Sequence, residues 1–388
     1  MHRLQFHYTL SRDASPALVR NPLIDLLQAV SQAGSISAAA RALNLSYRHV
    51  WGELKRWEDV LGHELIVWEK GQSARLTEFA AKLMWAEAQA QARLAPQIEA
   101  LRADLERTFA VAFDDSAHVV TLYASHDDAL SSLREHALQQ QHDRPDARIE
   151  FAGPLHLDIR FTGSVDAIRA LNEGRCVMAG FHTQINPAPG SLAERTYKPL
   201  LQPGLHKIIG FAQRSQGLMV AAGNPLQIAH LQDVCNKRAH FVNRPLGTGT
   251  RVLLDELLMQ EKIAPANLHG YERTESSHIA VAQAVASGAA DVGLGIEMAA
   301  RAKGLDFVPL LQENYHLVCL KSALNQPPIA ALRELLHSAA WQQTLAGLAG
   351  YTPSDSGQVL SLSQTLPWWN FKGKKRTSSP SYINSLLS

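Results

Sequence analysis

The first apolar pattern of the chain is helical. The leucines and the valine of NPLIDLLQAVSQAG, residues 21–34, recur at intervals of three and four, which predicts an amphipathic helix with one buried face. Asn21 can cap its first turn, and Pro22 at the next position lacks the amide that a first helical residue does not need. Gly34 is the expected stop.

A second, short helix is predicted over residues 38–43, with Ser37 as its cap. Its run of alanines has little bulk, so another helix can lie close across it. Asn44 and Leu45 form the expected turn, and Ser46 can cap a third helix. We therefore expect two helices joined by a tight turn.

The third helix has an apolar stripe and a basic polar surface. Four apolar residues recur at steps of four, three and four: Val50, Leu54, Trp57 and Leu61. Gly52 lies within the helix, where it costs roughly 1 kcal/mol against alanine and can permit close approach of a partner. Two helices joined by a tight turn, the second of them basic, form a helix-turn-helix arrangement, in which arginine can read guanine edges and lysine or serine can hold phosphates.

Two short strands around Gly71 would complete a wing, with Lys70 and Arg75 near its tip. The alternative is an ordinary helical hairpin with a solvated basic face. The candidate DNA-binding residues are Ser37, Ser46, Tyr47, Arg48, His49, Lys55, Arg56 and Arg75.

Residues 21–80 resemble the winged helix-turn-helix of LysR-type regulators, and within that group the molybdate-responsive ModE-like version. The resemblance lies in an ordered set of short pieces: Gly34-Ser35, Ala38-Ala39-Ala40-Arg41, Ser46-Tyr47-Arg48, Trp51, Leu61-Gly62 and Ala74-Arg75-Leu76-Thr77. It implies a head that binds double-stranded DNA.

Residues 77–112 follow as one long helical stretch that Pro96 should kink or split. Its apolar stripe can pair with a second copy of itself or pack on its own domain: Leu83, Ala90, Leu94, Ile98, Leu101 and Leu105. The LysR resemblance implies a linker helix that joins two heads, and hence a homodimer or a higher homo-oligomer. Two heads would double the phosphate contacts of a nearly neutral chain.

Residues 117–350 alternate strand-like and helix-like runs, which is typical of an α/β domain. The first lobe is expected to hold strands in 118–125, 155–164 and 176–182 with helices over 127–139 and 164–173. The second lobe begins near 206–225, contains a helix over 277–287 and returns to the first through 306–320. Two such lobes would enclose a hinged cleft.

Polar residues gather where these strands end, at the edge where doubly wound sheets bind ligands. The loop Gly247-Thr248-Gly249-Thr250-Arg251 can turn amides toward an anion, with charge from Arg244 or Arg251, although an ordinary strand-to-helix turn would look the same. Glu313 is left out because a carboxylate repels an anion. The candidate ligand-binding residues are Ser125, Ser164, His182, Thr248, Thr250, Arg251, Ser277 and His278, of which Ser164 and Ser277 are also good N-caps.

Residues 118–345 resemble the periplasmic-binding-protein-like (type II) domain of some helix-turn-helix regulators, in GSVDAIRALNEGRCVMAGFH, NRPLGTGTRVLLDELL and HIAVAQAVASGAADVGLGIE. Such domains are also joined to molybdenum-cofactor biosynthesis proteins. The resemblance implies a two-lobe receptor for a small effector. Hydroxyls and amides suit a tetrahedral oxyanion, with molybdate or tungstate ahead of sulfate or formate.

Composition narrows the class of protein. The chain is 46% hydrophobic and 19% charged with a net charge of +1, so a nucleic-acid surface must be local. Its three cysteines are too far apart for a zinc site or a disulfide framework. We expect a cytoplasmic protein, because no secretory leader and no apolar run of membrane-spanning length is present.

The sequence predicts a multidomain α and α/β protein: a winged helix-turn-helix, a long linker helix and a two-lobe receptor domain. We expect no enzyme, no metal and no resident cofactor, because no metalloprotease motif or nucleophile elbow occurs. A protein of molybdenum-cofactor metabolism and a constitutive DNA-binding protein are the alternatives. The expected parts are an extension (1–20), the head (21–76), the linker (77–112), the receptor domain (117–350) and a C-terminal tail (351–388) that is disordered at its end.

Overall fold

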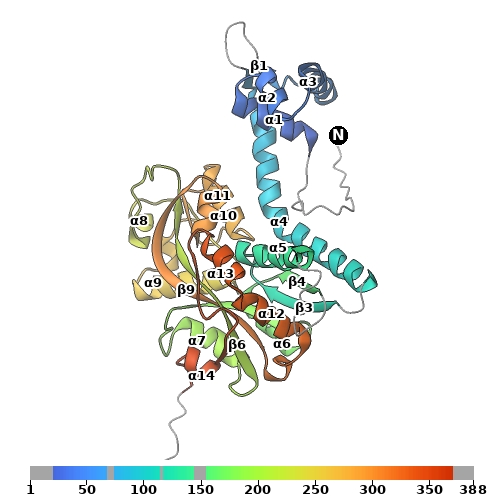
Figure 1. The fold of residues 1–388 in the computed structure, drawn as a ribbon. Helices are drawn as coiled ribbons and strands as arrows, with labels where there is room; N and C mark the ends of the chain where they lie inside the picture. The colour runs from blue at the N-terminus through green and yellow to red at the C-terminus, as the bar shows by residue number, and fades with distance from the viewer. Residues whose placement is uncertain (1–20, 68–73, 114–116, 144–153, 370–388) are drawn as a thin grey trace, which may run out of the picture.

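A computed structural model describes residues 21–67, 74–113, 117–143 and 154–369 of the chain. The head lies at one end of the molecule, joined to the rest by one long helix (Figure 1). The head comprises α1 (Pro22–Ala33), α2 (Ile36–Ala42), α3 (Tyr47–Leu61) and the antiparallel pair β1 (Ile66–Val67) and β2 (Arg75–Leu76). The extension 1–20, the wing tip with Lys70 and Gly71, and residues 370–388 lie outside the described residues.

The caps of the head explain where its helices begin and end. The Asn21 side chain accepts from the Leu23 amide, and Gly34 ends α1 in the left-handed region at φ 64°. Ser46 caps α3 by accepting from the His49 amide at 3.2 Å. The prediction for Ser37 was wrong: Ser35 is the cap of α2, because its Oγ accepts from the Ala38 amide at 3.1 Å. Ser37 is the second residue of the helix and is exposed.

The linker is the helix α4 (Glu78–Phe113), which contains Pro96 and is not split there. Figure 1 shows that α4 changes direction part-way along its length. A proline within a helix removes one backbone hydrogen bond and crowds the preceding turn, so a bend is the expected result.

The receptor domain is built on one curled, mixed sheet with the strand order β4-β3-β5-β9-β6-β8-β7. Two of its strands are 15 residues long and pass through both lobes, paired antiparallel with each other. Their register shifts between Gly210 and Ala212 and again between Gln216 and Gly217. The strands are β3 (His118–Ala124), β4 (Leu155–Phe161), β5 (Met178–Gln184), β6 (His206–Val220), β7 (Phe241–Val242), β8 (Val292–Ile296) and β9 (Asp306–Leu320).

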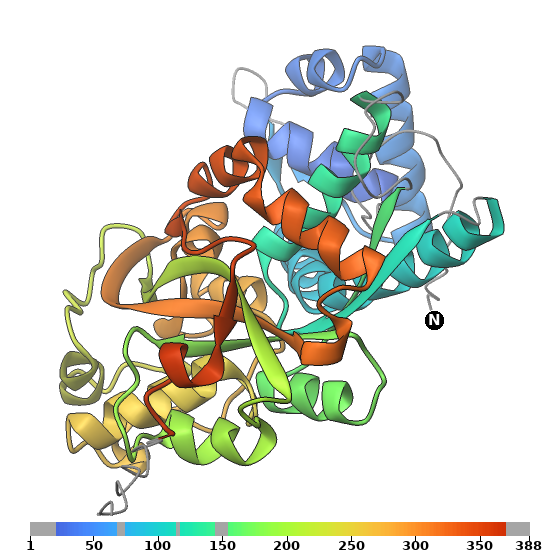
Figure 2. The same cartoon turned by 60° about the horizontal axis from the view of Figure 1, so that its bottom comes forward.

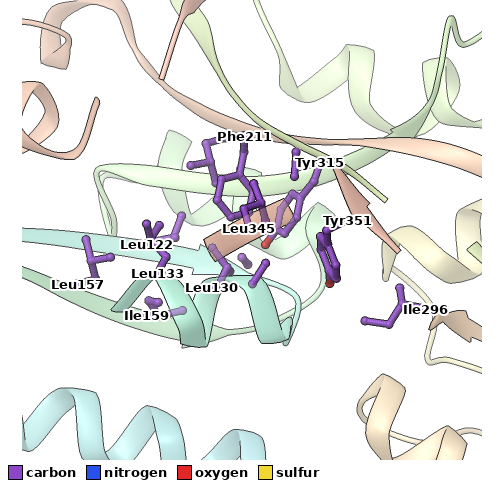
Figure 3. Close-up of a cluster of buried hydrophobic side chains, with 14 of the residues drawn as sticks. Leu122, Leu130, Leu133, Leu157, Ile159, Phe211, Ile296, Tyr315, Leu345 and Tyr351 are labelled. Carbon is purple, nitrogen blue, oxygen red and sulfur yellow. The ribbon is translucent and has the colours of Figure 1, made fainter. Parts of the chain in front are cut away.

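Helices cover both lobes (Figure 2). Those of the first lobe are α5 (Asp128–Asp143), α6 (Ser164–Asn172), α7 (Leu192–Tyr197), α12 (Pro327–His337) and α13 (Ala339–Ala346). Those of the second are α8 (Leu231–Asn236), α9 (Gly249–Gln260), α10 (His278–Ala286) and α11 (Glu297–Ala302). The largest core joins the two lobes, and Phe211, Tyr315 and Tyr351 lie in it beside leucines of β3 and α5 (Figure 3).

The expected tail from residue 351 begins with ordered elements. Strands β10 (Tyr351–Pro353) and β11 (Val359–Ser361) pair with β6, and α14 (Leu362–Thr365) follows. The Asp355 carbonyl passes so close to Gly210 that an added Cβ there would lie 2.1 Å from its oxygen, so the close approach requires glycine. The receptor domain therefore continues to the last described residue. Nowhere in the described ranges is a helix both long and apolar enough to cross a bilayer.

Candidate functional site

The exposed face of α3 carries the polar residues that the sequence singled out. Tyr47, Arg48 and His49 lie exposed in its first turn, while Val50 and Leu54 point into the core of the head. Lys55 lies 2.6 Å from Glu58 and 5.1 Å from the Trp51 ring centroid. The α3 face thus combines cations with rings that can hold them in place.

Arg56 also has a neighbour on α3, 2.5 Å away at Glu53. Arg75 lies exposed on β2, on the wing side of the head. Gly52 is exposed between these residues, and a Cβ added there would meet no atom within 4 Å. Since packing does not demand this glycine, it leaves a bare patch on the polar surface of α3.

The second site is a buried polar cluster between the two lobes. The first turns of three helices meet there: α6 begins at Ser164, α9 at Gly249 and α10 at His278. A Cβ on Gly249 would lie 3.2 Å from Ser164 Oγ and 3.0 Å from His182 Nδ1. Helix N-termini carry unpaired amides and a partial positive charge, which favour an anion.

Hydrogen bonds within the cluster join residues from different elements. Ser164 Oγ lies 3.5 Å from His182 Nδ1, and Thr250 Oγ1 lies 3.3 Å from His278 Nε2. Gln216 Nε2 is 3.4 Å from Thr250 Oγ1 and donates more closely to Glu313 Oε1 at 2.9 Å. These bonds form two groups, Ser164 with His182 and Thr250 with His278, Gln216 and Glu313, which adjoin at the first turn of α9.

Several polar atoms in the cluster have no hydrogen-bond partner among the described residues. They are Ser125 Oγ, His182 Nε2, Gln216 Oε1, Arg244 Nε, His278 Nδ1 and Tyr315 OH. Buried polar groups are normally paired, so each of these atoms costs free energy as it stands. Gln216 Oε1 is an acceptor, whereas the other atoms include potential donors from both lobes, and a small polar ligand within reach would satisfy some of them.

Two buried arginines differ in how the fold neutralises them. Arg214 donates to Glu313 Oε1 at 2.5 Å and to Asp127 Oδ2, which also accepts from Tyr351 OH at 2.8 Å. Burial raises the pKa of Glu313, and the positive charge of Arg214 offsets part of this rise. Arg214 is thus matched by carboxylates of the protein itself.

Arg244 is 2% exposed and has no carboxylate within salt-bridge distance in the described ranges. One of its nitrogens donates to the Glu275 carbonyl at 3.0 Å, while Nε is unpaired. Burial, and then the positive charge of Arg214, lower the pKa of Arg244 to about 9. Burial costs a guanidinium the free energy of its hydration, and Arg244 has no neighbouring anion among the described residues to offset that cost.

The two histidines of the cluster are held neutral. Burial, followed by the charges of nearby arginines, lowers the pKa of His182 and of His278 well below the usual value. A neutral imidazole has one donor and one acceptor nitrogen, so each ring can still donate one hydrogen bond. The cluster therefore offers neutral donors around one uncompensated cation.

Two family models match the chain. Residues 23–81 match the bacterial regulatory helix-turn-helix protein of the lysR family, and residues 148–337 match the PBP superfamily domain. The head therefore belongs to the lysR family of helix-turn-helix domains. The regulatory description of this family agrees with the expectation that the chain is not an enzyme. The part of the chain that matches this model includes α3 and its exposed face.

Two curated relatives are uncharacterized. The Bacillus subtilis (strain 168) protein YvgK is 32% identical over 201 residues, which is 52% of this chain and 64% of that protein. A Clostridium pasteurianum protein, named for its position in the 5′ region of a 2Fe-2S ferredoxin gene, is 39% identical over 111 residues, 28% of this chain and 98% of that protein.

Solved structures are also similar to the chain. The Corynebacterium glutamicum OxyR C206 mutant is 16% identical with a TM-score of 0.41, covering 85% of this chain and 95% of that one. Full-length BenM is 14% identical with a TM-score of 0.41, covering 84% of this chain and 96% of that one.

The structure brings Ser164, His182, Thr250 and His278 together in the cluster, and it places Ser125 at the end of β3 with a buried, unpaired hydroxyl. The other three candidates have additional contacts. Thr248 and Ser277 cap α9 and α10, as was considered for Ser277. Arg251 pairs with Asp255 at 3.1 Å and lies 4.1 Å from the Tyr271 ring centroid, so its charge is already matched.

Sequence reasoning missed Arg214 and Gln216 and excluded Glu313. A signal was present, because Gln213, Arg214, Ser215 and Gln216 interrupt an otherwise apolar strand. A polar run inside a buried strand indicates partners elsewhere in the fold. Glu313 belongs to the cluster as the partner of Arg214.

Proposed function

We propose that this chain is a cytoplasmic, dimeric transcriptional regulator whose receptor domain binds a small oxyanion. The observation that carries the ligand part is the buried Arg244, whose charge no carboxylate matches in the described part of the chain. Binding of ligand and of operator DNA would then be coupled reciprocally, typically by about 1–3 kcal/mol.

The exposed α3 face supports the DNA-binding part. In this proposal Arg48, with Tyr47 and His49, reads base edges from the first turn of α3, while Lys55 and Arg56 hold phosphates. Ser37, Ser46 and Arg75 would contact the backbone around them. The LysR match over residues 23–81 supports this assignment.

Exposed apolar residues on α4 support a dimer. Trp85 is 50% exposed and Leu101 is 62% exposed, which is unusual for large apolar side chains on a long helix. Leu101 belongs to the stripe that the sequence offered for pairing. A second copy of α4 would cover these side chains and bring two heads together.

For the ligand we propose contacts from Ser125, Ser164, His182, Thr250 and His278 around the Arg244 guanidinium, with Thr248 and Ser277 supporting the helix N-termini. Arg251 stays in the proposed site as a more distant charge. Molybdate and tungstate are the leading candidates, ahead of sulfate or formate, because several hydroxyl and N–H donors around one cation suit a tetrahedral oxyanion.

The test is a thermal melt of the purified chain with molybdate, tungstate, sulfate, phosphate or formate. A ligand at about 100 times its dissociation constant should stabilise the chain by about 2.7 kcal/mol, which raises Tm by about 5–10 °C. Arg244→Gln should abolish the shift. Arg251→Gln is the matched control and should keep most of it, because Arg251 already has a carboxylate partner.

A shift that survives Arg244→Gln would contradict the proposed site. No shift with any of the five anions would remove the oxyanion proposal and favour a DNA-binding protein that needs no such effector.

A further inference from the structure

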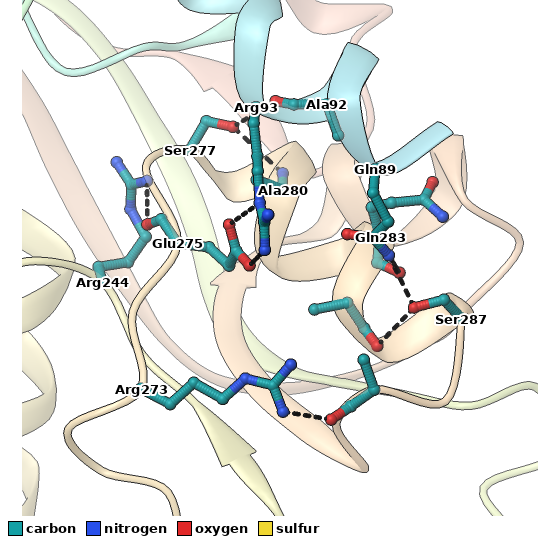
Figure 4. Close-up of polar contacts among 12 residues, drawn as sticks. Gln89, Ala92, Arg93, Arg244, Arg273, Glu275, Ser277, Ala280, Gln283 and Ser287 are labelled. Atoms are coloured by element: carbon teal, nitrogen blue, oxygen red, sulfur yellow. Dashed lines mark hydrogen bonds and ion pairs between the residues drawn. The ribbon is translucent and has the colours of Figure 1, made fainter. Parts of the chain in front are cut away.

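The linker helix α4 holds the second lobe directly. Arg93 forms a two-pronged pair with Glu275, at 2.7 and 3.1 Å, and Gln89 donates to Ser287 Oγ at 2.8 Å (Figure 4). Gln89 and Arg93 are one helical turn apart, so one stretch of α4 contacts both ends of α10. This stretch is the part of α4 that leads to the head.

A later stretch of the same helix holds the first lobe. Glu99 accepts from Ser131 Oγ at 2.8 Å, and its carboxylate lies 3.7 Å from His126 Nε2. Further along, Asp104 accepts from Arg160 at 2.5 Å, at β4. Thus α4 bridges the two lobes, which can move relative to each other only if this helix bends or one set of contacts breaks.

Pro96 lies between the two contact stretches, and the carbonyl that it leaves free in the preceding turn is linked to the second lobe. In a regular helix the amide of residue 96 would donate to the carbonyl of Ala92, but proline has no N–H. The Ala92 carbonyl instead accepts from Ser277 Oγ at 3.4 Å. The Ala92 carbonyl, which has no helical donor because of Pro96, is therefore bonded by Ser277, the cap residue of α10.

Both contact stretches adjoin the buried polar cluster. Glu275 accepts from Arg244 through its carbonyl and from Arg93 of α4 through its carboxylate, and Ser277 directly precedes His278. On the other side, His126 follows Ser125. If these segments move apart, the points at which α4 is attached to the two lobes therefore move apart as well.

We propose that α4 is a two-point strut whose bend at Pro96 converts the separation of the two lobes into the direction of the helix segment that carries the head. Gln89, Ala92 and Arg93 fix this segment to the second lobe, and Glu99 and Asp104 fix the remainder to the first. This inference deepens the proposed function. It rests on that proposal only for which ligand moves the lobes.

The test measures spin-label distances in the full chain without ligand or DNA, so its failure is separate from failure of the proposed ligand. One label replaces Lys82 on α4, and the second replaces either Glu173, in the first lobe, or Gln232, in the second, in a Cys235→Ala background. Lys82 lies about 21 Å along the helix from Pro96, at about 1.5 Å per residue. A change of about 20° in the bend would move it by about 7 Å.

Pro96→Ala supplies the missing amide and should straighten α4. We expect the distance from Lys82 to Glu173 to shift by several ångströms, while the distance from Lys82 to Gln232 keeps its mean because Arg93 and Gln89 still hold the second lobe. The control is Pro327→Ala, at the first residue of α12, where no helical hydrogen bond is missing; it should shift neither distance.

Arg93→Gln should instead broaden the distribution from Lys82 to Gln232. Its control is Arg301→Gln, which removes an exposed pair with Glu297 elsewhere on the second lobe and should leave that distribution unchanged. If Pro96→Ala moves neither distance, or moves both equally, α4 is not a strut and the proposal is wrong. An Arg93→Gln distribution as narrow as that of the control would also overturn it.

Discussion

The basic residues of α3 and the two arginines of the receptor domain differ in what neutralises their charge. On α3 the cations are exposed to water, and Lys55 and Arg56 have carboxylate neighbours on the same helix. In the receptor domain Arg214 and Arg244 are both almost completely buried, and only Arg214 is matched by carboxylates. Water screens the first group, whereas the second must be neutralised by the fold or by a ligand.

The two regions therefore differ in how they can respond to a charged partner. An exposed cation costs little free energy because water hydrates it. It can exchange its neighbouring carboxylate for a phosphate, and the affinity for that phosphate depends strongly on salt. A buried cation has no such freedom, so the energetic effect of its partner is large. The following predictions test this difference, from the largest expected effect to the smallest.

Replacing Arg214 by methionine should cost the most stability. It would leave the carboxylates of Asp127 and Glu313 buried without their cation, and breaking a buried pair in this way typically costs about 3–5 kcal/mol. The measurement is the free energy of unfolding in urea. Arg301→Met, at an exposed pair with Glu297, should change it by no more than about 0.5 kcal/mol. Equal losses in the two variants would contradict the comparison.

The double variant Arg48→Ala with Lys55→Ala should weaken binding to a duplex from the region upstream of its own gene by about 100-fold. The loss combines base and phosphate contacts in two heads, and the salt dependence of binding should become shallower. Removing Arg301 and Lys321, two exposed cations of the receptor domain, gives the same change in net charge as a control. A loss of equal size in that control would mean that charge alone decides binding.

Stability should fall as the pH is lowered below about 6.5. The pKa values of His182 and His278 are depressed in the folded chain, so the unfolded chain binds more protons between the depressed values and 6.5. Each imidazole should contribute roughly 1 kcal/mol of lost stability per pH unit in that window. Tm profiles of His182→Gln should be flatter than those of the wild type, whereas His230→Gln, at an exposed site, should follow the wild type.

Gly52→Ala should have opposite effects on folding and on DNA binding. The added methyl meets no atom within 4 Å, so helix propensity should raise stability by about 1 kcal/mol. If DNA approaches α3 at this bare patch, affinity should fall several-fold, as measured by fluorescence anisotropy. A stabilised variant with unchanged affinity would show that no partner comes close to Gly52.

The head could be predicted almost residue by residue because its signals are local. Asn21, Gly34 and Ser46 act through neighbours within a few positions, and the apolar stripe of α3 lies on one helix face. The error at Ser37 was a shift of two residues between neighbouring serines. Either serine can cap a helix. In the structure α2 begins at the buried Ile36, so the preceding Ser35 is the cap.

The receptor cluster could be predicted only in part because its contacts are distant in sequence. Polar residues at strand ends gave Ser164, His182, Thr250 and His278 correctly as neighbours. The pairing of Arg214 with Asp127 and Glu313 joins three strands or their ends, and no periodicity of the sequence reports it. For the same reason the contacts of α4 with α10 were not predicted.

The return of the chain to β6 at residues 351–361 has a consequence for biosynthesis. The core of the head draws on residues 23–84, so a growing chain can complete it early. The receptor core includes Tyr351, whose hydroxyl donates to Asp127 beside the cluster, so it is complete only once residue 351 has been made. A product that ends before residue 351 would therefore contain the whole core of the head and lack part of the receptor core. Under the proposed function, such a product would bind DNA without responding to a ligand.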